Sequence, residues 1–454
     1  MPKVYVKTLG CKVNTYDSHS LQADFKEQGY ELTKEPSDAD ISILNTCSVT
    51  GNADREGRYL LRKFKKANPK AMIVATGCYA QTDSEKLSSL DEVDLVIPNQ
   101  FKDKLVKLTD SGFQLKRSGQ PFNNTDQVKH KLPIEAKVVS KNRQGHFKTA
   151  LKLGPASSDR TRAFLKIQDG CNGFCTYCLI PYARGASRSV HPSEVKKEVR
   201  RQIELGIGEI VFTGIHIGDY GEDLSLGTET PFVELFREML DWDDMVRIRI
   251  SSLEPGEVNE EMLKIGAQRP ELFCDHFHLP LQSGHDRILK AMRRSYDTQH
   301  YSDIVEMILE YFPNANIGSD VIPGFPGETE EEFQATVDFI KKTGINYIHV
   351  FPYSKRPNTA AERIPGHLPQ QIVKERAACL RELSDDLKKD YYRQFINTEA
   401  EVLWEDKTDP SGRQVGHTRN YLEVAAAARV GAERGCKSKV LLKGFVENNR
   451  LLGI

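Results

Sequence analysis

The first hundred residues alternate short apolar runs with segments of helical periodicity. The apolar runs are VYVKTL at 4–9, ISILNT at 41–46 and MIVAT at 72–76. Between them, near 17–28 and 52–67, the polar and apolar positions have the spacing of helices. Strands that alternate with helices in this way are typical of a parallel α/β sheet. We therefore expect an α/β domain over residues 1–115.

A second alternating region begins after residues 116–156, which are polar and basic and are predicted to be a connector. Six apolar runs follow, at 163–167, 209–214, 246–252, 276–281, 315–322 and 347–354. Helical segments are predicted between or after them near 193–205, 231–240 and 328–343. Six strands alternating with helices predict a partial or complete (β/α) barrel over residues 157–390.

The pattern changes again after a charged, strongly helical stretch at 369–394. EAEVLWE, YLEVAAAA and KVLLKGFVE are short strands separated by glycine and polar turns. Such strands predict a small antiparallel β barrel over residues 391–454. The expected fold class is thus α/β multidomain, with a parallel sheet domain, a partial barrel and a small antiparallel barrel in series.

Composition adds limits to this picture. The chain has 454 residues, enough for about three domains. Its formal net charge is −1, so nucleic-acid binding would depend on local basic surface. We see no export signal at the N-terminus and no stretch near the ~20 apolar residues of a membrane span, so a cytoplasmic protein without a membrane partner is expected. Nine cysteines in such a chain favour metal or redox chemistry over disulfides.

Three cysteines form a compact motif in LKIQDGCNGFCTYCLIPYARG, directly after the strand predicted at 163–167. Cys171, Cys175 and Cys178 lie four and three residues apart, and Gly170 and Gly173 allow the loop to wrap a compact ligand. Structural zinc normally takes four protein ligands, and His191 is too distant for the spacing to imply it. Three buried free cysteines are the other alternative. A 4Fe-4S cluster with one open iron explains three ligands best, because that iron can bind S-adenosylmethionine (SAM).

This motif resembles the CxxxCxΦC motif of the radical SAM superfamily, which implies reductive cleavage of SAM to a 5′-deoxyadenosyl radical. The resemblance implies that Tyr177 lies against the adenine, and that Thr213 and Gly214 in FTGIHIG bind the methionine part of SAM. Further candidate SAM contacts at strand ends are Ser251, Glu254, Gln282, Ser283, Asp320 and Gly324. Each of these is equally explained as a loop or cap residue.

Three more cysteines each follow a predicted strand of the first domain. Cys11 follows VYVKTLG, Cys47 follows ISILNT and Cys78 follows MIVATG. Because parallel strands end at one edge of a sheet, the three thiolates should converge there and hold a second cluster with an open iron. Cys274, Cys379 and Cys436 lie in other modules and are interpreted as packing or surface residues.

Two such cysteine sets in one chain resemble the methylthiotransferase family along nearly the whole length, with GCKVN, NTCSVT and GCYAQ as matching motifs. The resemblance implies two 4Fe-4S clusters and two SAM molecules. One SAM methylates a sulfur on the auxiliary cluster, and the other supplies the radical that activates the substrate carbon. It also implies a low-potential electron donor of the flavodoxin or ferredoxin type, and catalytic roles for all six cysteines.

The tail resembles a TRAM domain, a small RNA-binding β barrel, through EAEVLWEDKT, GHTRNYLEV and KVLLKGFVE. Its cations are Arg413, Arg419, Arg429, Arg434, Lys437, Lys439 and Lys443. Phosphate contacts from these side chains and base stacking on Tyr421 would suit a tRNA anticodon stem-loop. A solvated charged face is the alternative interpretation.

Within the family, GCKVN, the cluster motif and HTRNYLEV look most like the enzymes that act at C2 of N6-threonylcarbamoyladenosine at position 37 of tRNA. Threonylcarbamoyl ends in a carboxylate, so we expect a cation in the pocket. Arg184, Arg188 and Arg356 are the candidates, with structural salt bridges as the alternative. The other functions considered are methylthiolation of isopentenyladenosine or of an aspartate in a small-subunit ribosomal protein, and an RNA-binding protein with structural clusters.

Overall fold

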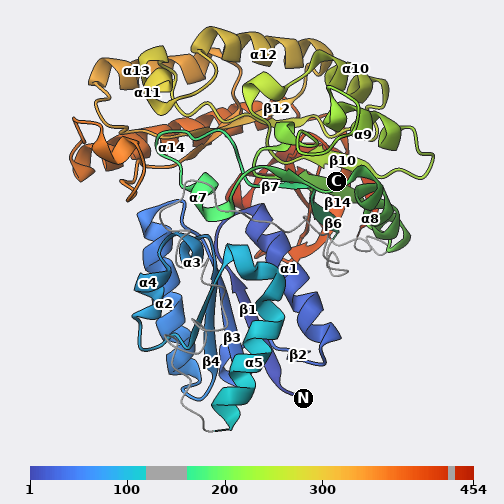
Figure 1. The fold of residues 1–454 in the computed structure, drawn as a ribbon. Coiled ribbons are helices and arrows are strands. Elements are labelled where there is room, and N and C mark those ends of the chain that lie inside the picture. Colours follow the sequence, from blue (N-terminus) through green and yellow to red (C-terminus); the bar gives the residue numbers. More distant parts are fainter. Residues whose placement is uncertain (119–160, 428–434) are drawn as a thin grey trace. The chain divides into compact units, whose positions relative to one another are not determined.

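The computed structural model describes residues 1–118, 161–427 and 435–454 (Figure 1). Their Cα positions divide into two compact units. The N-terminal unit takes the described residues within Met1–Ala156, Gln168–Val190 and Ser354–Thr359, and the barrel unit takes those within Ser157–Ile167, His191–Tyr353 and Ala360–Ile454. Apart from its first residues, the predicted connector lies outside the described residues.

The N-terminal unit is built on a parallel sheet, as the sequence predicts. Its strand order is β2-β1-β3-β4-β5, and every neighbouring pair is parallel. The bounds are Lys3–Thr8 for β1, Glu31–Leu32 for β2, Ile41–Thr46 for β3, Met72–Gly77 for β4 and Leu95–Pro98 for β5. Strands β2 and β5 were not predicted, because two and four residues are too few to give a clear strand periodicity.

Helices cover both faces of this sheet, which explains its unbroken apolar strands. On one face pack α1 (Lys12–Glu27) and α5 (Leu105–Arg117), and on the other α2 (Gly51–Ala67), α3 (Cys78–Thr82) and α4 (Ser84–Ser88) (Figure 1). Phe25 and Leu105 are fully buried on the first face, and Leu61 and Phe64 on the second. Short 3₁₀ helices at Pro36–Asp38 and Asn99–Lys104 complete this layer structure.

The inserted segment Gln168–Val190 adds a small hairpin and a helix to the N-terminal unit. Strands β7 (Gln168–Asp169) and β8 (Arg188–Ser189) pair in antiparallel fashion, and α7 (Ile180–Arg184) lies between them in sequence. The CxxxCxxC motif occupies the chain between β7 and α7.

The barrel unit contains the six predicted strands in two three-stranded parallel sheets. Their orders are β10-β9-β6 and β11-β12-β13, and an isolated bridge joins Ile248 of the first sheet to Phe273. The bounds are Arg162–Lys166 for β6, Glu209–Thr213 for β9, Arg247–Ile250 for β10, His276–His278 for β11, Asn316–Val321 for β12 and Tyr347–Val350 for β13. This arrangement confirms a partial (β/α) barrel.

Helices between these strands bury their apolar faces against the sheets, and Phe277 of β11, for example, packs on Phe312. They are α8 (Pro192–Glu204), α9 (Pro231–Leu240), α10 (Glu260–Gln268), α11 (Asp286–Met292), α12 (Thr298–Tyr311), α13 (Glu330–Lys342) and α14 (Gln370–Arg393), with 3₁₀ turns at Ile217–Asp219, Pro255–Glu257 and Ala361–Arg363. No helix in the described part of the chain has the length and apolarity needed to cross a membrane.

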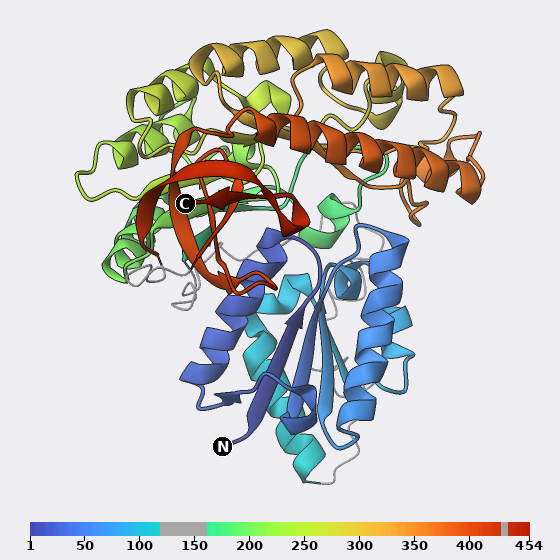
Figure 2. The ribbon, with the colours of Figure 1, turned by 180° about the vertical axis from the view of Figure 1, so that it is seen from behind.

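The C-terminal strands close into a five-stranded barrel in the order β14-β15-β16-β18-β17 (Figure 2). The bounds are Glu399–Thr408 for β14, Gln414–His417 for β15, Glu423–Ala426 for β16, Lys437–Val446 for β17 and Arg450–Gly453 for β18, with a 3₁₀ turn at Glu447–Asn449. Four pairs are antiparallel and the β16–β18 pair is parallel. Trp404, Val424 and Leu442 fill its core.

A buried ionic cluster joins the C-terminal barrel to β9 and β10 within the barrel unit. Arg249 donates to both carboxylate oxygens of Glu209, at 2.8 and 3.0 Å, and to the carbonyl oxygen of Arg419 at 2.9 Å. Arg247 donates to the carboxylate of Glu401 on β14 at 2.5 Å. Burial would raise the pKa of Glu209, but the charges and hydrogen bonds of these arginines outweigh it and lower the pKa to about 2.

This lowered pKa predicts a pH dependence of stability. A carboxyl whose folded pKa lies below its model value of 4.5 stabilises the fold at higher pH, and that contribution is lost as pH falls from about 4.5 to 2. The difference corresponds to about 3 kcal/mol. In urea unfolding, Glu209→Gln should therefore be less stable at pH 7 and lose less stability between pH 5 and 3. The exposed control Glu310→Gln should show the same dependence of unfolding free energy on pH as the wild type. The prediction would be contradicted if all three proteins gave parallel curves of unfolding free energy against pH.

A second prediction about stability concerns Gly77 at the end of β4. Gly77 has φ +97°, and a Cβ there would lie 2.4 Å from the Thr46 carbonyl oxygen. Gly77→Ala should therefore lower the free energy of unfolding of the metal-free protein by about 3 kcal/mol, through backbone strain and steric overlap. Gly29→Ala has a similar φ of +82° but open space around its Cβ, so about 1 kcal/mol is expected. Chemical denaturation measures both, and equal losses would show that the overlap is relieved without cost.

Candidate active site

The three N-terminal cysteines lie at the carboxyl ends of three neighbouring strands. Cys47 directly follows β3, and Cys78 directly follows β4 as the first residue of α3. Cys11 lies three residues beyond β1, as the N-cap of α1. Because β1, β3 and β4 are adjacent in the sheet, these ends share one edge. The residues form a three-cysteine set, called the edge triad below.

The edge triad sits in a setting that suits metal-bound thiolates. Burial raises the pKa of Cys47 to about 12, the backbone N–H of Val49 partly offsets this, and the nearby Cys78 and Cys11 raise it further. Burial also raises the pKa of Cys78, and the positive charge of Arg184 acts against it. The Asn99 amide nitrogen lies 3.8 Å from the Cys78 sulfur as a donor. Buried thiols of this kind become thiolates when a metal supplies the compensating charge.

The second set, Cys171, Cys175 and Cys178, is called the loop triad. The backbone N–H of Gly173 donates to the Cys171 sulfur at 3.3 Å, and that of Ile180 donates to the Cys178 sulfur at 3.4 Å. Gly170 has φ +80°, and a Cβ there would lie 2.0 Å from the Ala186 carbonyl oxygen, so glycine is required for the loop to close. Amides directed at sulfur and partial exposure suit a 4Fe-4S cluster that must meet a ligand. Tyr177, beside Cys178, is partly exposed.

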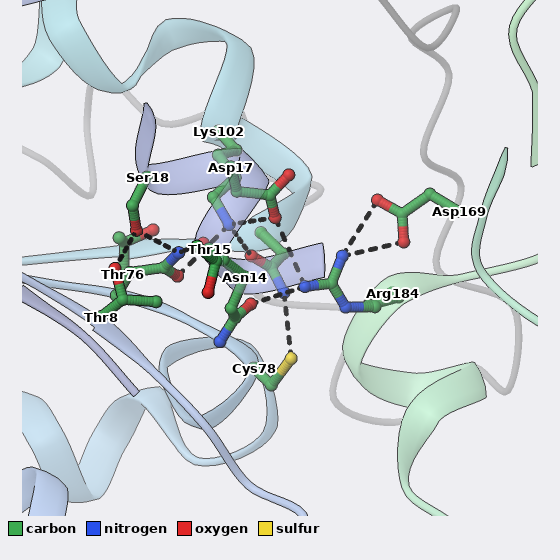
Figure 3. Close-up of polar contacts among 12 residues, drawn as sticks. Thr8, Asn14, Thr15, Asp17, Ser18, Thr76, Cys78, Lys102, Asp169 and Arg184 are labelled. Carbon is green, nitrogen blue, oxygen red and sulfur yellow. Dashed lines mark hydrogen bonds and ion pairs between the residues drawn. The ribbon is translucent and has the colours of Figure 1, made fainter. Parts of the chain in front are cut away.

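Arg184 lies at the centre of a buried polar network (Figure 3). Its side chain is 2% exposed. One terminal nitrogen donates to both oxygens of Asp169, at 2.8 and 3.0 Å. The other donates to the Asn14 side-chain oxygen at 2.6 Å and to Asp17 at 3.3 Å. The side chain that we predicted as a substrate-binding cation is therefore engaged in structural ion pairs, the alternative that the sequence left open.

Sequence reasoning missed the residues that surround Arg184. Lys102 donates to Asp17 at 2.8 Å, and Asn99 donates to the carbonyl oxygen of Ala183 at 3.0 Å. A signal was present in α1, where Asn14, Asp17 and Ser18 precede Leu21 on the buried face. Polar side chains at helix positions that normally face a core indicate a buried polar site.

The two other candidate cations also lie in the N-terminal unit. Arg356 is nearly buried, and it pairs with Asp54 at 2.6 Å and donates to Ser48, next to Cys47, at 2.9 Å. Arg188 donates to the carbonyl oxygen of Arg184 at 2.8 Å and lies 3.7 Å from Asp169. Its side chain is 16% exposed, the largest fraction among the three arginines.

In the barrel unit, the predicted SAM contacts lie at or just beyond strand carboxyl ends. Thr213 ends β9 and Ser251 follows β10, and both are buried. Gly214 and Ser283 follow β9 and β11. Gln282 has a left-handed backbone with φ +68°, an unusual conformation for this residue type that often marks functional loops.

Three of these candidates have partners of their own in the barrel unit. Asp320 accepts from His278 at 2.9 Å, and Glu254 is paired with Arg294. The Gly324 N–H donates to Glu328 at 2.7 Å. These contacts match the alternative of loop and cap roles, and a SAM contact at each position remains a proposal.

Among the described residues, His216, Asp219 and Glu257 form one compact group of possible single-ion ligands. The two ring nitrogens of His216 each face a different carboxylate, at 2.9 Å from Asp219 and 2.6 Å from Glu257. Contacts between the imidazole and the two carboxylates therefore account for the group.

The predicted RNA contacts in the C-terminal barrel have different outcomes. Lys437 and Lys439 are exposed on β17, whereas Arg429 and Arg434 lie outside the described residues. Tyr421 requires a correction, because its ring stacks on His417 and is contacted by the guanidinium groups of Arg162 and Arg249. The ring belongs to the joint with β6 and β10, so it is not available as a base-stacking platform.

Comparisons with known proteins agree with this architecture. Residues 3–98 match the model described as "Uncharacterized protein family UPF0004", and residues 165–340 match that of the Radical SAM superfamily. Among solved structures, the radical S-adenosylmethionine methyltransferase TsrM from Kitasatospora setae aligns with a TM-score of 0.51 and 14% identity, over 78% of this chain and 75% of that one. This likeness concerns the fold.

Curated relatives are more similar in sequence. The threonylcarbamoyladenosine tRNA methylthiotransferase MtaB of Bacillus subtilis is 39% identical over 93% of this chain and 90% of its own length. The protein of the same name from Aquifex aeolicus is 38% identical, over 88% and 92%. The tRNA-2-methylthio-N(6)-dimethylallyladenosine synthase of Bartonella quintana is 33% identical, over 93% and 90%.

The superfamily match implies a 4Fe-4S cluster and SAM as cofactors, and the loop triad is the set of residues that fits them. Because the similarity to the curated relatives extends over nearly all of both chains, the chain belongs to the radical SAM methylthiotransferase family and is an enzyme of that family.

Proposed function

We propose that this enzyme methylthiolates C2 of N6-threonylcarbamoyladenosine at position 37 of tRNA, with two 4Fe-4S clusters and two SAM molecules. The observation that carries the proposal is the edge triad, a second three-cysteine set at one edge of the N-terminal sheet. The names of the relatives at 39% and 38% identity support the substrate. A relative named for the dimethylallyl nucleoside, at 33% identity, keeps the isopentenyladenosine alternative open.

The six cysteines divide the chemistry between them. Cys171, Cys175 and Cys178 would hold the cluster that, when bound, cleaves SAM to the 5′-deoxyadenosyl radical after receiving an electron from a flavodoxin- or ferredoxin-type donor. Cys11, Cys47 and Cys78 would hold the second cluster, with a coordination position left for an exchangeable sulfur. Tyr177 is proposed to lie against the adenine of SAM, and the strand-end residues of the barrel unit are proposed to bind SAM. These residues are Thr213, Gly214, Ser251, Glu254, Gln282, Ser283, Asp320 and Gly324.

The carboxylate of the threonylcarbamoyl group needs a cation, and Arg188 is the best of the three candidates. Arg184 and Arg356 are nearly buried in ion pairs with Asp169, Asp17 and Asp54. Arg188 is the most exposed of the three, and its guanidinium lies 3.7 Å from Asp169. A guanidinium in that position can form a bidentate pair with a ligand carboxylate.

The C-terminal barrel supports binding of a tRNA anticodon stem-loop. Exposed lysines on β17, among them Lys437 and Lys439, can neutralise phosphates, which makes binding sensitive to salt.

The central prediction concerns product and cluster content. After anaerobic reconstitution the protein should hold about eight irons per chain, and with SAM and reductant it should add a methylthio group to a stem-loop that carries threonylcarbamoyladenosine. Replacing Cys11, Cys47 and Cys78 together by alanine should leave about four irons and deoxyadenosine formation but abolish methylthio product. Replacing Cys171, Cys175 and Cys178 should abolish both activities. Iron analysis and mass spectrometry of nucleosides measure these outcomes.

The controls separate the alternatives. A stem-loop with isopentenyladenosine, an unmodified stem-loop and the small-subunit ribosomal protein serve as competing substrates. Methylthio product on only one of these competing substrates would assign that substrate to the enzyme. About four irons per wild-type chain would contradict the presence of a second cluster. Stem-loop binding without SAM turnover would favour an RNA-binding protein with structural clusters.

A further prediction tests the role of Arg188. Arg188→Gln should raise the KM for the threonylcarbamoyladenosine stem-loop about tenfold or more, because a charge-assisted hydrogen bond to the carboxylate is lost. SAM cleavage without RNA should be unchanged. The same substitution should not affect binding of an unmodified stem-loop, measured by fluorescence anisotropy. Equal weakening of both stem-loops would assign Arg188 to general RNA contact instead.

A further inference from the structure

We propose that Arg184 is a positioning residue that couples the two cysteine sites, by fixing the loop triad's segment to α1 and by keeping a positive charge at the edge triad. The inference rests on the proposed function, because it assumes a metal cluster at Cys11, Cys47 and Cys78. Both cysteine sets and Arg184 belong to the N-terminal unit.

The hydrogen bonds of Arg184 reach the chain on both sides. Asp169, which accepts two of them, lies two residues before Cys171, and the Gly170 N–H also donates to it at 2.9 Å. Asn14 lies three residues after Cys11, and its amide nitrogen donates to the carbonyl oxygen of Thr46, next to Cys47, at 3.0 Å. The guanidinium of Arg184 therefore joins Asp169, close in sequence to Cys171, to Asn14, close in sequence to Cys11; Figure 3 shows its contacts with Asp169 and Asn14.

Asn99 makes a parallel connection. Its amide nitrogen donates to the carbonyl oxygen of Ala183, the residue before Arg184, and lies 3.8 Å from the Cys78 sulfur. Lys102 donates to the Asn99 oxygen at 3.2 Å, to the Asn45 oxygen at 3.3 Å and to Asp17 at 2.8 Å. The segment that carries Arg184 is thus held at the edge triad by a second set of contacts.

The network also places charged side chains beside the cysteines. The cations Arg184, Lys102 and Arg188 pair in this network with the carboxylates of Asp17 and Asp169. Arg184 lies close to Cys78, because the Asn99 amide nitrogen donates to the carbonyl oxygen of Ala183, the residue before Arg184, and is 3.8 Å from the Cys78 sulfur. Net positive charge near a cluster favours its reduced form, which carries one more electron.

Two substitutions separate charge from geometry. Arg184→Gln removes the charge, and Arg184→Lys keeps it but cannot bind Asp169 at two points and Asn14 at the same time. In the background that lacks Cys171, Cys175 and Cys178, Arg184→Gln should disfavour reduction of the remaining cluster about tenfold, a shift of about 59 mV to lower potential. Arg184→Lys should leave that potential close to the wild-type value.

The loop side of the coupling has its own measurement. In the background that lacks Cys11, Cys47 and Cys78, both Arg184 variants should lose iron to a chelator several-fold faster than the parent, because Asp169 is no longer anchored to α1. The matched control is Lys116→Gln, which removes a half-buried cation paired with Asp94 at 2.9 Å beside β4 and β5. It should lower unfolding stability without changing either readout.

Each outcome has a distinct meaning. Unchanged potential in Arg184→Gln, or equal shifts in Arg184→Lys and Arg184→Gln, would overturn the electrostatic part. Wild-type iron loss in both variants, or the same acceleration in Lys116→Gln, would overturn the positioning part. A wild-type protein with about four irons would overturn the proposed function itself, whereas eight irons with unaltered Arg184 variants would overturn this inference alone.

Discussion

Parallel strands that are neighbours in a sheet end at the same edge, and the N-terminal site depends on this constraint. Cys11, Cys47 and Cys78 are 36 and 31 residues apart in sequence, yet each follows one of the adjacent strands β1, β3 and β4. Helices bury both faces of the sheet that holds these strands. The fold therefore brings the three thiols together, which lowers the ordering cost of assembling a site.

A charged side chain is also buried at this edge, and removing a charge from water costs free energy. Arg184 is almost fully removed from water, and such a charge is tolerated when it is paired and hydrogen-bonded. Asp169, Asp17 and Asn14 provide those partners, and they come from two segments that are far apart in the chain. A buried ion pair adds little net stability compared with apolar packing, but it defines which segments can meet. This property suits a site in which the segments that carry the two cysteine sets must keep a fixed relation.

A second buried ionic cluster has a comparable role in the barrel unit. Glu209, Arg247 and Arg249 lie on β9 and β10 and bind backbone and side-chain groups of the C-terminal barrel. The ring of Tyr421 is part of this joint. The barrel that carries the exposed lysines is thereby attached to the partial barrel by contacts that cannot be replaced one at a time without leaving a buried charge unbalanced.

The sequence by itself determined the fold class, the partial barrel with its six strands, and the two cysteine sets. These features follow from local periodicity and from short spacings, which the order of residues contains directly. It did not reveal the short strands β2 and β5, because two to four residues carry too little periodicity. Only the tertiary structure shows that Arg184, Arg356 and Tyr421 contact distant parts of their own chain. A long charged or aromatic side chain can pair with a ligand or with a distant part of its own chain, and the choice depends on which groups the fold buries beside it.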